Sequence, residues 1–447
     1  MQQVGFSKLL PVRARLEVMR SAIALLAAVS MLLSLARGDV ATHASPTKPP
    51  PLMARTMPDV EAAMLQALVA VNLTDRLTWV AADTNGHLTI GWLVLLYPTN
   101  LADPVETLQS HAWDLVRTTL TAVPSLDEIH LTGLSRGTAP FGTYRHLVTF
   151  SAAISRTEFR AMEQSASPVQ PFRRVSRVWF HPALLQVERH EPKEDWFPSG
   201  KPTRPVAPEL AMRFSGTQSA QVRESQHRAS GVTRGTLIED KLYHGDHSLP
   251  LVALTFDDGP FPIYTTLLLD TLDRVHLTAT FFLVGEQVEQ YPFFAQAIGQ
   301  AGHEIGNHTF HHLNLTQLSA QAVEGELRRT QDVIFAVTGQ TPRYFRPPGG
   351  DYNDTVLRIA RALGLITVFW TDNPGDYTNP GPRVLAEKTL ANITNGGIIL
   401  LHQGVGDTIR ILPPDRGSLA AAAPNPRSSQ WTAGPGKIAG WRALGNA

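Results

Sequence analysis

The stretch LTFDDGP, residues 254–260, places two acids side by side at the end of an apolar run. The apolar residues before the acids are typical of a buried strand, and Gly259-Pro260 predicts a turn after them. Neighbouring carboxylates repel each other and lose hydration when they are buried, so core packing does not explain the pair. Asp257 and Asp258 are therefore candidate functional residues, and the rest of the chain must supply their partners.

Short apolar strands alternate with amphipathic helices through residues 249–412. Repeated strand-helix units predict a parallel sheet, in the form of a (β/α) barrel or an open doubly wound sheet. In both architectures the chemistry collects at the carboxyl ends of the strands. Polar side chains follow five of the predicted strands: Asp257 and Asp258, His308 and His312, Arg346, the group Asp372, Asn373 and Asp376, and His402.

A metal site is predicted from His308 and His312, which lie four residues apart in HTFHH. On a helical turn this spacing puts two imidazoles on one face, and Asp257 or Asp258 would complete a His-His-Asp set. The chain has 0 cysteines, so thiolate ligands are excluded. Nitrogen and oxygen ligands suit zinc, and also cobalt, manganese or nickel. Three protein ligands and an open position are typical of a hydrolytic metal site.

These motifs resemble the NodB-homology polysaccharide deacetylases, carbohydrate esterase family 4. TFDDGP matches the first motif of the family, HTFHH the second, RPPGG most of the third and ILLHQ the fifth. The resemblance covers about a third of the chain, from Val252 to His402. It implies a distorted (β/α) barrel of the NodB type, incomplete at its C-terminal end if the low-complexity tail replaces the last helix and strand.

The resemblance also implies roles for single residues. Asp258, His308 and His312 would hold one divalent metal ion, and Asp257 would be the general base. Arg346 would orient Asp257.

For the remaining site residues, the resemblance implies that His402 is the general acid and Asp376 the carboxylate that tunes it. The backbone N–H of Gly349 would help to hold the oxyanion. Three departures from the family pattern stand out: Gly349 replaces a frequent Tyr, Gln403 replaces a frequent Asp, and WTDNPGDY carries Asn373 at the first acid position of the fourth motif.

The N-terminal part of the chain is predicted to direct export. Residues 1–40 combine a basic start with the uncharged run 21–36, which is typical of a cleaved signal peptide or an uncleaved membrane anchor. Residues 41–57 form a Pro-rich linker. We therefore expect a secreted or cell-surface protein, and membrane attachment through the apolar segment is one of the two alternatives.

A first folded module is predicted over residues 58–191, with two helices, a hairpin at Asn85-Gly86, two further strands and a short helix. It contains no pattern of metal ligands, nucleophile or phosphate loop, so a wall-interaction domain and a structural spacer both remain open. Residues 192–248 read as a linker, residues 249–412 as the deacetylase domain, and residues 413–447 as a low-complexity tail expected to be disordered.

The charge composition limits the classes of partner that the protein is expected to bind. The formal net charge is +0 and no basic face stands out, which argues against nucleic acid. The expected partner is an acetylated polysaccharide, and the expected function is deacetylation of peptidoglycan or a chitin-like N-acetylglucosamine polymer. Two alternatives stay open: an O-acetyl esterase acting on xylan or a similar glycan, and a catalytically impaired glycan-binding protein.

Overall fold

The computed structural model describes residues 57–74, 76–97, 105–138, 144–164, 175–181, 241–248, 251–412 and 440–442. The predicted export segment, the Pro-rich linker apart from Met57, the second linker up to residue 240 and most of the tail lie outside these ranges. The described residues form two sheets, one of five strands and one of eight, each from a separate stretch of the sequence.

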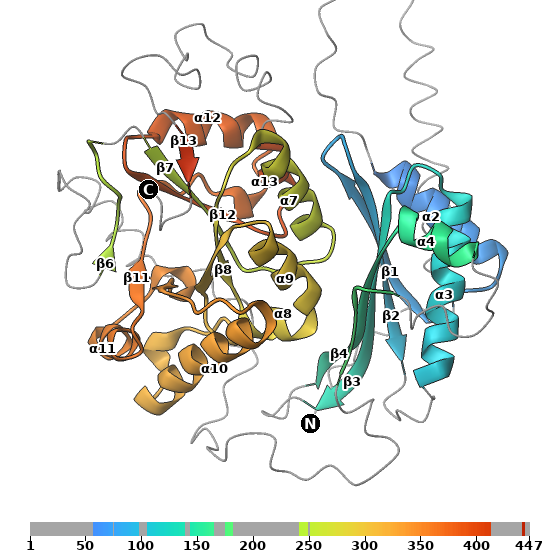
Figure 1. The fold of residues 1–447 in the computed structure, drawn as a ribbon, viewed down its shortest axis with the longest axis horizontal. Helices are drawn as coiled ribbons and strands as arrows, with labels where there is room; N and C mark the ends of the chain where they lie inside the picture. Colours follow the sequence, from blue (N-terminus) through green and yellow to red (C-terminus); the bar gives the residue numbers. More distant parts are fainter. Residues whose placement is uncertain are drawn as a thin grey trace, which may run out of the picture. The chain divides into compact units, whose positions relative to one another are not determined.

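The N-terminal module is a mixed sheet with helices on one face (Figure 1). Its strands follow the spatial order β1-β2-β3-β4-β5, in which β2 and β3 pair in parallel and the other neighbours pair antiparallel. The elements are α2 (Pro58–Ala70), β1 (Leu77–Thr84), β2 (Thr89–Tyr97), α3 (Val105–Ala122), β3 (Glu128–Thr138), β4 (Tyr144–Ser155), α4 (Arg156–Glu163) and β5 (Val178–Phe180). The predicted small α+β module is confirmed, while β5 is too short to predict from alternation.

The predicted hairpin between β1 and β2 turns at Asn85-Gly86. Gly86 has a φ of 88°, which only glycine adopts at little cost. The side-chain oxygen of Asn85 accepts hydrogen bonds from the backbone N–H groups of His87 at 3.0 Å and Leu88 at 2.9 Å. The sequence signal and the structure agree because this turn chemistry is local.

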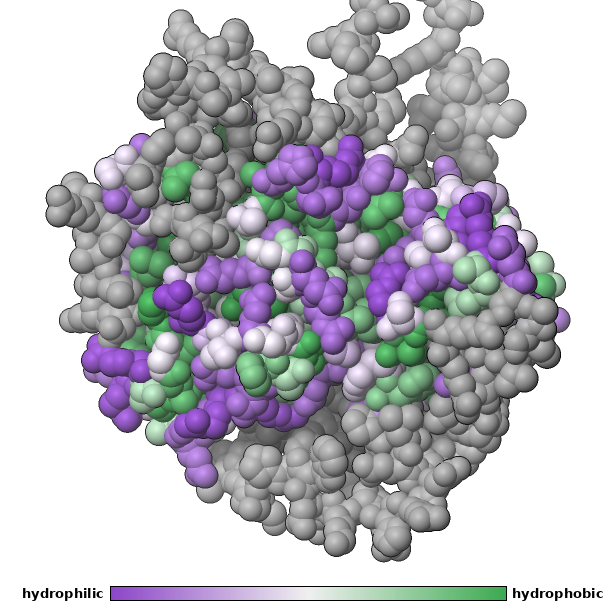
Figure 2. Space-filling view, in the orientation of Figure 1, coloured by the Kyte–Doolittle hydropathy of each residue, from purple (hydrophilic) through white to green (hydrophobic). Residues whose placement is uncertain are grey.

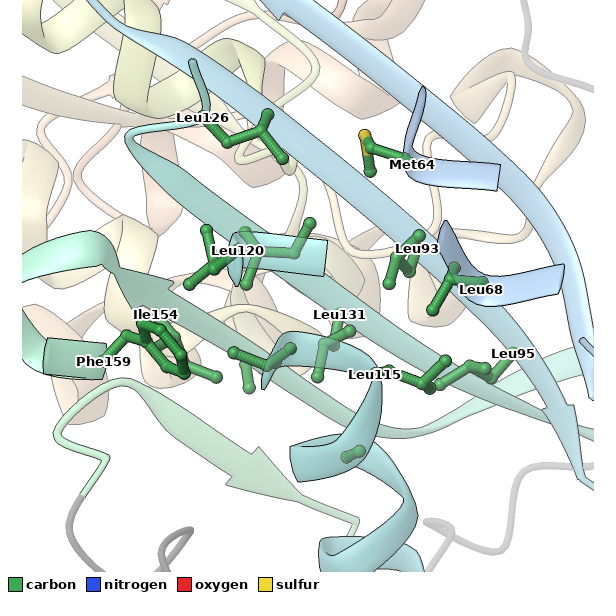
Figure 3. Packing of buried hydrophobic residues seen from close by; sticks show 14 of the residues in the cluster. Met64, Leu68, Leu93, Leu95, Leu115, Leu120, Leu126, Leu131, Ile154 and Phe159 are labelled. Atoms are coloured by element: carbon green, nitrogen blue, oxygen red, sulfur yellow. The ribbon is translucent and has the colours of Figure 1, made fainter. Parts of the chain in front are cut away.

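The core of the module lies between the sheet and its helices (Figure 3). Alternate residues of each strand point to this side, whereas the helices contribute one apolar stripe each. Among the fully buried members are Met64, Leu68, Leu93, Leu115 and Leu131. The module therefore has a hydrophobic core of its own.

The second sheet is parallel along its path β12-β7-β8-β9-β10-β11-β6 and curls into an incomplete barrel, which confirms the predicted fold class. Its strands are β6 (Lys241–Leu242), β7 (Leu251–Asp257), β8 (Thr280–Leu283), β9 (Glu304–Asn307), β10 (Tyr344–Phe345), β11 (Ile366–Val368) and β12 (Gly397–His402). The α-helices are α7 (Tyr264–Val275), α8 (Gly285–Gln290), α9 (Pro292–Gln300), α10 (Ala320–Thr338), α11 (Asp354–Ala362), α12 (Pro382–Asn392) and α13 (Gly406–Ile411). Short 3₁₀ turns are η4 (Leu315–Gln317), η5 (Pro348–Gly350) and η6 (Asp376–Thr378).

The position of β7 in the sheet explains why the residues before Asp257 are apolar on both faces of the strand. All six residues from Val252 to Asp257 are buried, as expected for a strand with neighbours on both sides and packing above and below. Because β7 lies between β12 and β8, its last residue reaches the carboxyl edge of the sheet together with the ends of its neighbours.

The second sheet contains strands from outside the stretch 249–412, at both of its ends. The sheet includes β6, which pairs in parallel with β11 and lies within the stretch 192–248 that the sequence predicts as a linker. Two-residue strands carry too little alternation to be recognised. At the other end, β13 (Gly440–Arg442) lies within the predicted tail and pairs in parallel with the start of β7.

Within the described ranges, no helix has both the length and the apolar character needed to cross a membrane. Figure 2 shows hydrophilic and hydrophobic side chains interspersed in small patches over the described part of the viewed surface.

Candidate metal and catalytic site

The candidate site lies where the parallel strands of the second sheet end. Asp257 is the last residue of β7, and His402, the last residue of β12, is its direct neighbour in the register of the two strands. His308 follows β9 and Arg346 follows β10. Carboxyl ends of parallel strands share one edge of a sheet, so this topology brings together side chains that are far apart in the sequence.

Asp258, His308 and His312 form the metal-ligand group that the sequence predicts as a candidate. Their ligand atoms all lie within 4.8 Å of one another. Oδ1 of Asp258 is 3.3 Å from Nε2 of His308 and 3.1 Å from Nε2 of His312. The sequence left Asp257 and Asp258 open as the third member, and Asp258 is the acid that faces both imidazoles.

The hydrogen bonding of His308 fits a metal ligand. Its Nδ1 is 2.7 Å from the backbone carbonyl of Arg346, which can only accept, so Nδ1 carries the proton. In its neutral form, His308 presents the lone pair of Nε2 to the carboxylate of Asp258. Two acceptors facing each other at 3.3 Å repel, unless a proton or a cation lies between them. This donor set suits a divalent cation, and zinc fits two imidazoles and one carboxylate.

The loop that carries the two histidines is not the helical turn that their spacing predicts. After β9 the chain bends through Thr309, with a φ of 65°, and His312, with a φ of 57°. The rings still converge, with their centroids 4.9 Å apart at an angle of 63°. The expectation of a helix is therefore wrong, while the pairing of the imidazoles is present.

Glu326 holds this bend, although it is not among the site residues predicted from the sequence. One carboxylate oxygen of Glu326 accepts the backbone N–H groups of Phe310 at 3.0 Å and His311 at 2.8 Å, and the other lies 2.6 Å from Nδ1 of His311. Glu326 is 8% exposed and lies on the buried face of α10, between Val323 and Leu327. An acid at a core-facing helical position is the signal that would have identified it.

Asp257 and Asp258 serve different partners because the backbone changes direction between them. Asp257 ends a regular strand, whereas Asp258 has a φ of 81°, a conformation that costs energy for a residue other than glycine. Oδ1 of Asp257 accepts a hydrogen bond of 2.6 Å from Nη1 of Arg346, while Asp258 faces the histidines. The repulsion between the two carboxylates is therefore offset by separate partners, Arg346 for Asp257 and the histidines for Asp258.

Arg346 is fully buried and fixes Asp257 from beneath the site. Its Nη1 also donates to Oγ1 of Thr255 at 2.8 Å, and its Nη2 donates to the carbonyl of Phe369 at 3.1 Å. The guanidinium lies over the ring of Phe282, 4.2 Å from its centroid. The hydrogen bond from this buried guanidinium holds the carboxylate of Asp257 in one orientation.

A second pair, His402 and Asp376, lies at the end of β12. Oδ1 of Asp376 is 2.7 Å from Nδ1 of His402, and its Oδ2 accepts the backbone N–H of His402 and the hydroxyl of Thr408, both at 2.6 Å. Burial opposes the charged imidazole. The hydrogen bond and charge of Asp376, with the charges of Asp258 and Asp257, outweigh burial and raise the pKa of His402 to about 9. His402 is therefore protonated at neutral pH.

The altered fourth motif still supplies a carboxylate to the histidine. Asp376, fully buried, makes this contact, whereas Oδ1 of Asn373 accepts the N–H of Gly375 and Oδ1 of Asp372 accepts from the side chain of Asn392. Tyr377 stands edge-on to His402, with ring centroids 5.5 Å apart. Thr408, which shares Asp376 with His402, was also missed from the sequence, because α13 is too short to show a pattern.

Gly349 lies in the turn η5 after β10, with a φ of 61°. This conformation explains why glycine stands there. Its role as a backbone donor for an oxyanion stays a prediction.

The arrangement contains a ligand set for one cation, a carboxylate beside it that Arg346 orients, and a protonated imidazole on the neighbouring strand. These are the parts needed to attack an acyl carbon with water and to protonate a leaving group.

Comparison with known proteins finds similar proteins among the polysaccharide deacetylases. Residues 244–368 match the family described as polysaccharide deacetylase. A peptidoglycan-N-acetylglucosamine deacetylase from Bacillus cereus is 38% identical over 159 residues, which cover 35% of this chain and 74% of that protein. The deacetylase PgdA of Listeria monocytogenes is 37% identical over 151 residues, or 34% of this chain and 32% of that protein.

Among solved structures, a family 4 carbohydrate esterase from Streptomyces lividans, in complex with acetate, is 34% identical to this chain. The match covers 38% of this chain and 88% of that chain, with a TM-score of 0.36.

Proposed function

The chain belongs to the polysaccharide deacetylase family, and on that premise we propose that it is a metal-dependent hydrolase that removes N-acetyl groups from a glycan outside the cytoplasm. The substrate class is peptidoglycan or a chitin-like polymer of N-acetylglucosamine. The observation that carries the proposal is the group Asp258, His308 and His312 beside Asp257, which is paired with His402 in the register of β7 and β12.

Asp258, His308 and His312 would hold the metal ion, with the two imidazoles binding through Nε2. When bound, the cation supplies a Lewis acid for the acetyl carbonyl. Zinc is our first choice for this ligand set, and cobalt, manganese and nickel are the alternatives to be compared.

Asp257 would accept a proton from the attacking water, and its hydrogen bond from Arg346 orients it for that task. The water oxygen forms a bond to the acyl carbon, and the bond between that carbon and the sugar nitrogen breaks. His402 would donate its proton to the departing nitrogen, which leaves as an amine and needs that proton. Asp376 keeps His402 charged and turned toward the site.

The location outside the cytoplasm is a proposal from the sequence of residues 1–40, whose basic start and uncharged run suit export. Whether that segment is removed or anchors the protein is testable by N-terminal sequencing of the mature protein and by fractionation of membranes.

A panel of substrates tests the proposed function. The full chain is depleted of metal with a chelator, reloaded with zinc or cobalt, and supplied with N-acetylglucosamine oligomers, peptidoglycan and acetylated xylan. Acetate from the first two substrates supports an N-deacetylase, and acetate from xylan alone points to an O-acetyl esterase. Glycan binding without acetate, by protein shown to contain metal, overturns the proposal in favour of a binding protein.

A further inference from the structure

The sheet of the N-terminal module is buried on one face and over much of the other. One face packs against α2, α3 and α4, as described above. On the opposite face, side chains that alternate with the core positions are also at most 1% exposed: Ile90, His130, Thr132, Ser151 and Ala153. A sheet face with this burial needs a cover, and the helices of the module lie on the other side.

The cover comes from the deacetylase domain. Ile90 belongs to one buried cluster with Ile263, Leu267 and Ile409, and Ala153 belongs to another with Tyr291, Phe293 and Phe294. These partners lie in or directly before α7 and α9, and in α13.

Polar contacts accompany this packing. The hydroxyl of Ser151 donates to the carbonyl of Gln290 at 2.6 Å, and the side chain of Asn85 donates to Asp270 at 2.7 Å. These residues of the module lie outside the matched family region, 244–368, so the family resemblance assigns them no role.

One buried contact links the module to the loop that follows the paired acids. Nδ1 of His130 accepts the backbone N–H of Ile263 at 2.7 Å. Nε2 of His130 therefore carries the proton and donates to Oε1 of Glu128 at 2.5 Å. Arg177 donates to both oxygens of Glu128, at 3.0 and 2.8 Å. Burial lowers the pKa of His130, and the neutral tautomer is the form that can hold Ile263.

Ile263 is five residues beyond Asp258 and has a φ of 64°, so its backbone needs support. It precedes α7, where the hydroxyl of Thr265 donates to the side-chain oxygen of Gln403 at 3.1 Å. The backbone N–H of Gln403 donates in turn to the carbonyl of Asp257 at 2.9 Å. A connected set of hydrogen bonds thus runs from the module to the backbone of the general base.

We propose that the N-terminal module is a fixed cover of the deacetylase domain, and that His130 is a positioning residue that holds the loop between the paired acids and α7. The docking of the module is inferred from the buried contacts and does not depend on the proposed function. The consequence for catalysis rests on the proposed function, since the loop matters to the rate only if the site is active.

Hydrogen–deuterium exchange of the full chain tests the proposal without using activity. His130→Gln keeps a donor for Glu128 at the ε position but removes the acceptor for Ile263. His303→Gln is the matched control, because His303 is a buried histidine whose Nδ1 accepts from Ala279 within the deacetylase domain. In His130→Gln we expect the peptide 261–267 to exchange roughly tenfold faster, as for the loss of one buried hydrogen bond. Equal exchange of this peptide in wild type and His130→Gln overturns the positioning role.

Acetate release then separates positioning from folding. If the site is active, His130→Gln should lower kcat with unchanged metal content and little change in KM. Inactive wild-type protein would count against the proposed function, while the exchange result would still decide the role of His130.

A second measurement covers the case in which His130→Gln fails to fold. The chain has 0 cysteines, so Ser151→Cys places one thiol under the proposed cover, and Ala62→Cys places one on the exposed side of α2 as a control. We expect a thiol reagent to label Ser151→Cys at least tenfold more slowly than Ala62→Cys, since labelling would require the cover to open. Equal labelling rates overturn the docking.

Discussion

At the scale of the residue, the two neighbouring acids have separate tasks. Asp258 faces the imidazoles and Asp257 faces Arg346, because the positive φ of Asp258 turns its side chain away from the strand direction. This division leads to different expectations for two variants that differ by one position in the sequence.

Asp258→Asn should lose metal, and Asp257→Asn should keep it. An amide is a weaker ligand than a carboxylate and leaves the site without its negative charge, so we expect metal affinity to fall by at least about tenfold in Asp258→Asn. Metal content measured by mass spectrometry after dialysis against a buffered metal concentration checks this. Loss of metal in Asp257→Asn, or its retention in Asp258→Asn, would contradict the assignment of the two acids.

His402 should titrate at a raised pKa in the metal-free protein. Its pKa of about 9 lies above the ordinary value of 6.5, so the charged form stabilises the fold. That stability is fully present below the ordinary value and is lost as the pH rises through about 9. NMR titration of the ring should show the raised pKa, and Asp376→Asn should lower it. An unchanged titration in that variant would show that Asp376 does not govern the charge of His402.

At this scale the sequence revealed most of the site. Asp257, Asp258, His308, His312, Arg346 and His402 were all predicted as candidates, because each lies at or shortly beyond the end of a strand and carries a side chain that packing does not require. Glu326 and Thr408 were missed because their roles depend on contacts across 15 to 32 residues, which no local spacing reports.

At the scale of the element, the bend after β9 and the helix α10 form one unit. Glu326 reaches from α10 to two backbone N–H groups and one imidazole of the bend, and the side chain of Asn307 donates to the carbonyl of Leu327 at 2.8 Å. The positive φ values of Thr309 and His312 are therefore supported by a neighbouring helix.

Glu326→Gln should weaken metal binding although Glu326 is not a ligand. The neutral amide binds the backbone donors and His311 less strongly, and loss of such support around a metal site typically costs 10–100-fold in affinity, roughly. Glu324→Gln, on the exposed face of α10 beside Arg328, is the control and should bind metal as the wild type does. Titration calorimetry with zinc compares them, and equal affinities in both variants would rule out a supporting role for Glu326.

The same bend shows where prediction from periodicity fails. A spacing of four residues suggested a helical turn for His308 and His312. The two imidazoles converge instead through a bend in which Thr309 and His312 adopt positive φ angles. Spacing reports which side chains can converge, whereas the backbone path depends on what the neighbouring helix offers. Regular elements such as β7 and α3 were predicted well because their patterns repeat along the chain.

At the scale of the whole molecule, metal binding should be coupled to stability. A ligand that binds the folded state alone stabilises it by about 2.7 kcal/mol at a concentration 100 times its Kd. We expect zinc to raise the Tm of the wild-type chain and to leave that of Asp258→Asn almost unchanged. Differential scanning calorimetry at several zinc concentrations measures this, and an equal rise in both proteins would place the binding elsewhere in the chain.

The order of domains could be predicted from the sequence, but their edges and contacts could not. The alternation of strands and helices predicted the parallel sheet, and the hairpin signal at Asn85-Gly86 predicted part of the N-terminal module. Strand β6 could not be predicted because it has only two residues. The strands of the module show no sequence pattern that distinguishes a covered second face from an exposed one. Which surfaces meet is decided by shape and by pairs such as His130 and Ile263, 133 residues apart.

The central claim is that Asp257, beside the metal-ligand group, drives hydrolysis of an N-acetyl group. Its most direct test is acetate release from N-acetylglucosamine oligomers by zinc-loaded wild-type protein and by Asp257→Asn with the same metal content. We expect acetate from the wild type and a rate at least about 100-fold lower from the variant, as for loss of a general base. Equal rates in the two proteins, or no acetate from fully loaded wild type, would contradict it.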